Sequence, residues 1–278
     1  MIIDAHAHLR RGCTDLDDIV ASRKVESLWI MDLSGANISY APYATEAEVL
    51  TAARRYPGFI VPFGYLDLSG NPENIDALCE KGFIGLKPYK PVKPYDHHDY
   101  FPFYERASSL GMPILFHTGI VSYGKPGEQN ASLGHGCSTM RPSYLASIAE
   151  AFPALTIIGG HLGYPWLDET EMNLYYYPNI YHDLSGYRKD IEWFIRILDR
   201  KCNDGTKRYF NEKILFATDA LYGTPESNAY ALKLVQFWEL FLEMIGGNYY
   251  RWGEPSEREN VLCGNARKIQ NEFAPGWR

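Results

Sequence analysis

The sequence lacks long apolar runs, a basic excess and paired cysteines. No run of about 18 apolar residues occurs in its 278 residues, so no membrane-spanning helix is predicted. The formal net charge of −7 argues against nucleic acid as a partner, since nucleic-acid binding usually requires a basic surface. The N-terminal residues show no charged segment followed by an apolar one, so we expect no signal peptide.

The cysteines are few, scattered and odd in number, and none forms a C-x-x-C pair. This usage is typical of a reducing compartment rather than of a disulfide framework, and it predicts a cytoplasmic protein. Phosphate-binding glycine loops are missing as well: neither G-x-G-x-x-G nor a Walker sequence is present. That absence argues against an open, doubly wound nucleotide-binding sheet.

Apolar, β-rich runs alternate along the chain with stretches of helical periodicity. The predicted strands are Ile2–His6, Leu28–Leu33, Phe59–Leu66, Phe83–Lys87, Pro113–His117, Leu155–His161, Ile180–Leu184 and Ile214–Asp219. The predicted helices are Leu16–Lys24, Thr45–Tyr56, Pro72–Glu80, Tyr100–Leu110, Arg141–Phe152, Trp166–Tyr176, Lys189–Arg200 and Glu226–Ile245. Eight alternations of strand and helix indicate a parallel sheet, and the count fits an α/β protein with a (β/α)8 TIM barrel.

Nothing in the sequence suggests a linker or a repeat, so residues 1–278 are interpreted as one domain. The last segment, Ser256–Phe273, is expected to form C-terminal closing helices that pack on the outside. Two connections are longer than a barrel turn needs, namely Tyr89–Asp99 and Thr118–Met140. Both follow strands, so we expect them to form walls or a lid at the barrel face where active sites lie.

The first strand carries polar residues at every second position, Asp4, His6 and His8. A strand would place these side chains on one face, where two imidazoles can reach one cation. A lone H-x-H is more often just a solvated strand end. Here, however, other predicted strands also end on polar residues: Lys87, His117, His161 and Asp219. In a closed barrel these ends meet at one mouth, so the residues together predict a metal site.

The chain also resembles a known family, the amidohydrolase superfamily, and in particular its branch of small amidohydrolase-related metal-dependent hydrolases and decarboxylases. The resemblance runs from His6-Ala7-His8 to the segment Glu259–Arg267, which is similar to the Asn-Ala-x-x-hydrophobic signature of the family's closing helix. It implies that His6, His8, His117 and Asp219 bind one divalent ion. It also implies that His161 is a catalytic or substrate-polarising group.

This donor set suits zinc best, although manganese or iron would also bind to histidine and carboxylate ligands. Asp219 can hold the metal with one oxygen and take a proton from water with the other, while His161 can donate a proton. Asp4 is interpreted as an acceptor that orients one ligand histidine. Lys87 leaves two arrangements open. In binuclear relatives a carboxylated lysine on the fourth strand bridges two metals, with His117 and His161 on the second ion. In mononuclear relatives an unmodified lysine at this position would be a cation near the substrate. We favour one metal.

Other polar residues near the mouth are weaker candidates. Lys90, Lys93, Arg141 and Arg188 could bind a substrate anion, although surface solvation is the commoner role for such residues. His135 could enter the site from its loop. His97, His98 and His182 are interpreted as structural or solvent-facing. Tyr123, Tyr164 and Trp166 could form an aromatic wall.

These observations predict a metal-dependent hydrolase that uses metal-activated water on a C–N or C–O bond of a small, anionic molecule such as an amide, lactone or cyclic imide. The alternative on the same barrel is a non-oxidative decarboxylase of an aromatic or unsaturated acid. A third reading is a metal-binding barrel without turnover, but a structural zinc site is closed and rarely keeps a spare acid and base. The expected partner is a small-molecule substrate, and the resemblance implies a homodimer.

Overall fold

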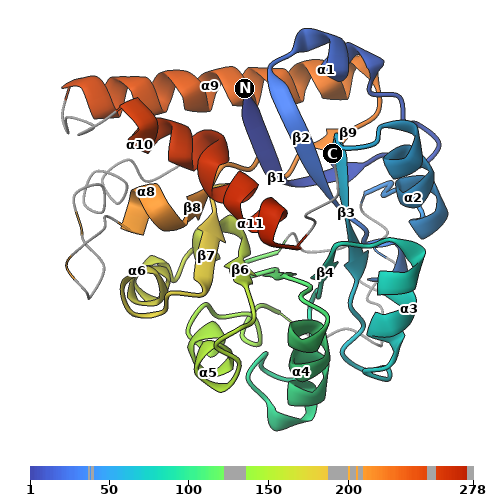
Figure 1. Cartoon of the computed structure of the whole chain (residues 1–278), viewed down its shortest axis with the longest axis vertical. Coiled ribbons are helices and arrows are strands. Elements are labelled where there is room, and N and C mark those ends of the chain that lie inside the picture. Colours follow the sequence, from blue (N-terminus) through green and yellow to red (C-terminus); the bar gives the residue numbers. More distant parts are fainter. Residues whose placement is uncertain are drawn as a thin grey trace.

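The computed structural model describes residues 1–36, 38, 41–121, 136–186, 200, 205, 209–248 and 255–273. Its centre is a sheet of parallel strands surrounded by helices (Figure 1). The strands are β1 (Ile2–Leu9), β2 (Val25–Met31), β3 (Ile60–Tyr65), β4 (Gly85–Lys87), β5 (Ile114–Phe116), β6 (Ile157–Gly159), β7 (Ile180–Asp183), β8 (Ile214–Leu215) and β9 (Leu221–Tyr222). They follow the order β8-β7-β6-β5-β4-β3-β2-β1-β9, so each strand lies beside its sequence neighbour except where β9 pairs with β1.

The sheet closes on itself because its two edge strands, β8 and β9, are successive pieces of one segment. The chain between them also bonds to β1: Ala5 N donates to Phe216 O at 3.0 Å, and Asp219 N donates to His6 O at 2.8 Å. The predicted TIM barrel is therefore confirmed. The predicted eighth strand, Ile214–Asp219, is wrong in its extent, because Asp219 has a left-handed backbone (φ 55°) that a strand cannot continue through.

Helices follow most of the strands at positions close to those predicted. They are α1 (Asp17–Ser22), α2 (Glu46–Arg55), α3 (Asn74–Lys81), α4 (Phe101–Ser109), α5 (Tyr144–Ala151), α6 (Leu167–Tyr176), α8 (Tyr209–Lys213), α9 (Pro225–Asn248), α10 (Pro255–Glu259) and α11 (Asn265–Phe273). The start of α2 shows the local cause. The Thr45 side chain accepts from Glu48 N, and Thr45 N donates to the Glu48 carboxylate at 2.7 Å, which forms a capping box. The predicted helix Lys189–Arg200 lies almost entirely outside the described residues.

Buried side chains form two layers, one between the strands and the helices and one inside the barrel. The inner layer includes Ile3, Trp29 and Phe63, and it packs against Ala266 and Ile269 of α11. The closing helix α11 therefore covers the N-terminal end of the barrel, and Figure 1 shows it in front of the strands. The prediction that it packs on the outside of the barrel is wrong.

Asn265 explains why the Asn-Ala pair begins this closing helix. The side chain of Asn265 is buried, and its Nδ2 donates to Asn211 O at 2.7 Å and to Ile214 O at 2.9 Å. Asn211 lies in α8 and Ile214 begins β8, so one amide fastens α11 to the barrel. The opposite, C-terminal end of the barrel stays free for a site.

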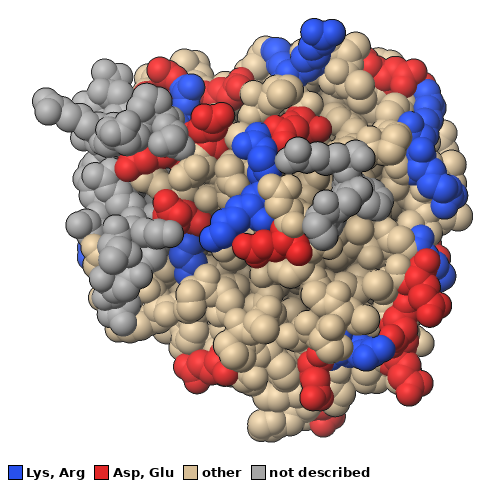
Figure 2. Space-filling model, viewed as in Figure 1, with Lys and Arg blue, Asp and Glu red and all other residues tan. Residues whose placement is uncertain are grey.

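The face of the molecule on which α11 lies carries both positive and negative side chains. Acidic and basic side chains are interspersed there (Figure 2), and one such pair joins Arg267 Nε to Glu26 at 3.0 Å. None of the helices in the described ranges combines the length and the apolar character needed to cross a membrane.

Candidate metal centre

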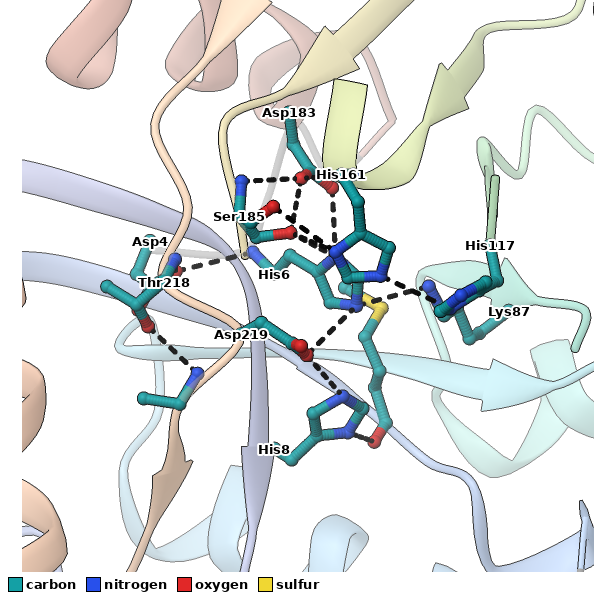
Figure 3. Close-up of polar contacts among 12 residues, drawn as sticks. Asp4, His6, His8, Lys87, His117, His161, Asp183, Ser185, Thr218 and Asp219 are labelled. Atoms are coloured by element: carbon teal, nitrogen blue, oxygen red, sulfur yellow. Dashed lines mark hydrogen bonds and ion pairs between the residues drawn. The ribbon is translucent and has the colours of Figure 1, made fainter. Parts of the chain in front are cut away.

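The polar residues predicted from strand ends do gather at the C-terminal end of the barrel. His6 and His8 lie on β1, and Lys87 is the last residue of β4. His117 follows β5 directly, so its side chain leaves the barrel wall at the mouth. Figure 3 shows these side chains pointing toward one another from separate strands.

His161 and Asp219 stand in turns beyond the strands rather than in them. Both have positive φ, 58° for His161 and 55° for Asp219, a conformation that is strained for residues other than glycine. Hydrogen bonds hold each turn in place: His161 N donates to Asp183 Oδ1 at 2.9 Å, and Asp219 N donates to His6 O at 2.8 Å. The strained turns aim both side chains back over the barrel mouth.

The partners of His6 and His8 fix which ring nitrogen carries the proton. His6 Nδ1 lies 2.8 Å from Asp183 Oδ2, and His8 Nδ1 lies 3.0 Å from Met31 O. Carboxylate and carbonyl oxygens only accept hydrogen bonds, so each Nδ1 must be the donor. The lone pair of each neutral ring is then on Nε2. This is the arrangement that histidine ligands of metals usually show.

Both Nε2 atoms face the carboxylate of Asp219. Asp219 Oδ1 lies 3.2 Å from His8 Nε2 and 3.7 Å from His6 Nε2 (Figure 3). Two lone pairs and a carboxylate oxygen repel one another unless a cation lies among them. The donor atoms of these three residues lie within 4.8 Å of one another, so the arrangement fits a divalent metal.

The electrostatic surroundings keep these groups in ligand form. Burial and the charge of Lys87 lower the pKa of His6 to about 4, so its ring is neutral at pH 7. The imidazoles of His8, His161 and His6 surround the Asp219 carboxylate and hold its pKa below the usual range. Burial would raise the pKa of Asp183, but its interaction with His6 holds that pKa below the usual range. Both carboxylates are therefore ionised.

His117 and His161 form a second pair beside this group. His161 Nε2 and His117 Nδ1 lie 3.2 Å apart, and the His6 and His161 ring centroids are 4.9 Å apart. Among the described residues, two groups have metal-binding geometry: His6, His8 and Asp219 form one, and His6, His161 and Asp183 form the other. His117 belongs to neither group. Its role as the fourth ligand therefore stays a prediction.

Lys87 is buried against the metal-binding group. Its Nζ lies 3.1 Å from His6 Nε2, the nitrogen that a metal would need. Burial lowers the pKa of Lys87 from 10.5 to about 8, although Asp183 and Asp219 partly oppose this shift. Lys87 is thus still a cation at pH 7, and it lies beside the candidate centre.

Asp4 contacts His6 through the backbone and not through the imidazole ring, since Asp4 Oδ1 accepts from His6 N at 3.4 Å. Its carboxylate accepts hydrogen bonds from Thr218 N (2.9 Å), Thr218 Oγ1 (2.6 Å) and Tyr222 OH (2.9 Å). These bonds hold the segment on either side of Asp219. A bulge in β1 between Asp4 and Ala7 explains this position of the Asp4 side chain, because it breaks the strict alternation of side chains.

Asp183 is the residue of the candidate centre that sequence reasoning missed. Besides His6 and His161, its carboxylate accepts from Ser185 N at 2.9 Å, and the Ser185 hydroxyl lies 2.8 Å from His161 Nδ1. Asp183 ends β7 just as the other polar residues end or follow their strands. That position was the available signal.

Aromatic and apolar side chains line part of the mouth. The Tyr43 ring lies 4.7 Å from the His8 ring, and the Tyr89 ring meets the His117 ring edge-on at 5.2 Å. Tyr43 and Tyr65 pack on a small cluster formed by Leu33, Ala36 and Tyr89. The metal-binding group therefore faces a partly aromatic wall.

The weaker candidates fall mostly outside the centre. Arg141 Nε donates to Glu169 at 2.9 Å, and Lys93 pairs with Asp99, so both cations have carboxylate partners. Lys90 lines a cavity of about 560 Å³ together with Tyr65 and Tyr89. His182 is fully buried, and His97 and His98 begin the short 3-10 helix before α4. Tyr164 and Trp166 are half-buried, and Tyr123, His135 and Arg188 lie outside the described residues.

Comparison with known proteins places the chain in a structural context. A family model described as amidohydrolase matches residues 3–269. No curated protein sequence matches. An uncharacterised TIM-barrel protein of Bordetella bronchiseptica shares the fold with a TM-score of 0.68 at 18% identity, over 98% of this chain and 99% of that one.

Two solved structures with assigned chemistry are also similar. A probable 2-pyrone-4,6-dicarboxylic acid hydrolase of Acinetobacter baumannii, with citric acid bound, has a TM-score of 0.58 at 13% identity, over 96% of this chain and 98% of that one. A dihydroxybenzoic acid decarboxylase of Polaromonas, with bound manganese, has a TM-score of 0.57 at 16% identity, over 98% and 96%. Such identities show a common fold.

Replacing His6 and His8 together by alanine tests the metal assignment. Because the two Nε2 atoms supply half of a four-ligand site, we expect the double variant to lose bound metal, measured by elemental analysis, while far-UV circular dichroism stays unchanged. His97→Ala with His98→Ala is the matched control, since this pair begins the short 3-10 helix before α4, and it should keep its metal. A double His6 and His8 variant that retains a full complement of metal contradicts the assignment.

Lys87→Met tests whether the lysine is a ligand. Because Lys87 Nζ competes for His6 Nε2 instead of adding a donor, the variant should retain at least as much metal per chain as the wild type. Lys90→Met, in the loop after β4, is the control. Two ions per wild-type chain, with one lost in Lys87→Met, would instead establish a bridging, carboxylated lysine.

Proposed function

The chain belongs to the amidohydrolase family, and we propose that it is a metal-dependent hydrolase acting on a C–N or C–O bond of a small, anionic molecule such as an amide, lactone or cyclic imide. Enzymes of this family use a divalent metal. Zinc is the proposed ion, since two imidazoles and a carboxylate suit it, and manganese or iron would be accepted by the same donors.

The convergence of His6 Nε2, His8 Nε2 and Asp219 Oδ1 carries the proposal. When bound there, a divalent ion would polarise a substrate oxygen and lower the pKa of water from 15.7 toward about 7. His117 is proposed as a further ligand because it lies on the same side of the mouth, next to His161.

Asp219 would supply the general base. Its side chain is 37% exposed, so the carboxylate is accessible from the mouth while Oδ1 faces the histidines. A low pKa keeps the carboxylate ionised, and Oδ2 is then free to accept a proton from water and pass it to the leaving group. The hydrogen bonds that Thr218 donates to Asp4 hold the neighbouring backbone, so Asp219 need not reorganise during the reaction.

His161 would stabilise charge that develops on the substrate or give it a proton. Its backbone N–H is held by Asp183, and its Nδ1 lies 2.8 Å from the Ser185 hydroxyl. Nε2 therefore points across the mouth toward His117. A ring fixed on both sides can donate in a defined direction.

The aromatic wall supports one alternative, non-oxidative decarboxylation of an aromatic or unsaturated acid. Tyr43 against His8 and Tyr89 against His117 would pack on a planar substrate placed over the imidazoles. In that reaction the C–C bond to the carboxylate breaks, carbon dioxide leaves, and the ring carbon takes a proton from His161, or from Asp219 after its carboxylate has taken a proton from water.

Turnover in water labelled with oxygen-18 separates the two reactions. The zinc-loaded protein would be incubated with 2-pyrone-4,6-dicarboxylic acid, other lactones and cyclic imides, and with 2,6-dihydroxybenzoic acid. Hydrolysis predicts solvent oxygen in a new carboxylate of a ring-opened product, detected by mass spectrometry, and no product after chelation of the metal. Release of carbon dioxide with no solvent oxygen in any organic product would contradict hydrolysis and support the alternative.

His161→Asn separates proton transfer from metal binding. We expect the variant to keep its metal and most of its substrate affinity, because Asn can still form hydrogen bonds. Loss of acid–base help should lower kcat by about 10²–10⁴-fold. Loss of metal together with activity would make His161 a ligand, and near-normal kcat would make it structural.

A further inference from the structure

Arg10 directly follows β1, two residues after His8. The backbone pairing of β1 with β9 is regular from His8 onward: His8 N donates to Ala220 O at 2.9 Å, and Arg10 N donates to Tyr222 O at 2.8 Å. In extended chain, alternate side chains face the same side. Arg10 therefore extends on the side of the chain from which His8 reaches the candidate centre.

A second contact places Arg10 independently. Arg10 forms an isolated antiparallel bridge with Tyr43, and the side chains of two directly paired residues lie on one face. The Tyr43 ring packs on the His8 ring at 4.7 Å. Arg10 and His8 thus flank Tyr43 at the barrel mouth.

The guanidinium of Arg10 is uncommitted. Its Nε is buried without a hydrogen-bond partner, and within the described residues no carboxylate pairs with it. The neighbouring arginine differs: Arg11 is exposed, and its Nε donates to Tyr43 O at 3.2 Å. A buried donor without a partner is costly, so a ligand that supplies an acceptor gains from meeting it.

A guanidinium recognises a carboxylate through two parallel N–H···O bonds, which fit one planar anion to one arginine. We propose that Arg10 is a specificity-determining residue that binds a substrate carboxylate remote from the reacting bond. The inference rests on the proposed function for the position of that bond, at the group formed by His6, His8 and Asp219. The substrates would then be organic acids. Their scissile bond would lie at the metal-binding group, and their carboxylate would lie on the other side of Tyr43, at Arg10.

Binding of two isosteric probes tests this role. Isothermal titration calorimetry would compare isophthalate with 3-carbamoylbenzoate, in which a neutral amide replaces one carboxylate, on the zinc-loaded full-length protein. The wild type should bind isophthalate about 10- to 100-fold more tightly, as expected for charge-assisted hydrogen bonds. Arg10→Gln should abolish that preference, whereas Arg11→Gln, the matched control, should keep it.

Several results would overturn the inference. They are a wild type that binds neither probe or shows no preference, a preference that persists in Arg10→Gln, and loss of zinc in Arg10→Gln. If the wild type binds inorganic phosphate more tightly than isophthalate, and Arg10→Gln loses this binding, then the group that Arg10 recognises is a phosphate ester and not a carboxylate.

Failure of the proposed function is distinguishable from failure of this inference. If the oxygen-18 experiment shows no hydrolysis while the carboxylate preference depends on Arg10, the function fails and the Arg10 site stands. If hydrolysis is metal-dependent and Arg10→Gln leaves the preference intact, the function stands and Arg10 has no such role.

Discussion

The hydrogen bond between His6 Nδ1 and Asp183 is the interaction on which the candidate centre depends. It joins the first strand to the seventh inside the barrel mouth, at 2.8 Å and fully buried. It sets the tautomer of His6, so that Nε2 presents a lone pair, and the same carboxylate anchors the turn that carries His161. One buried anion therefore orients both the proposed metal ligand His6 and the proposed catalytic group His161.

The closure of the barrel provides the other half of the site. β8 pairs with β7 and β9 pairs with β1, and the chain between them carries Asp219 on a left-handed turn. Asp4 holds this turn through Thr218 and Tyr222. The last strand is thus interrupted where the carboxylate must face the histidines. A continuous strand would point Asp219 elsewhere.

Much of this arrangement was predictable because it follows from strand periodicity and barrel geometry. The alternation of His6 and His8, and the polar residues at successive strand ends, are enough to predict a site at the C-terminal face from the sequence alone. Asp183 was missed because its partner is distant in sequence. Its own run, ending His182-Asp183, also reads equally well as an ordinary strand end.

Features that depend on local departures from regularity were not predictable. The bulge in β1 turned Asp4 away from the histidines, and the positive φ of Asp219 split the predicted last strand into two pieces. The position of α11 was also misjudged, since an amphipathic helix can cover the barrel end as well as its side. What covers the end is decided by Asn265 and the side chains beneath it.

Anomalous diffraction from crystals grown with zinc measures the central claim most directly. We predict a peak bonded to His6 Nε2, His8 Nε2 and Asp219 Oδ1 at about 2.0–2.2 Å, with His6 Nδ1 still donating to Asp183. A peak bonded to other residues, or no peak at this group in zinc-grown crystals, would contradict it.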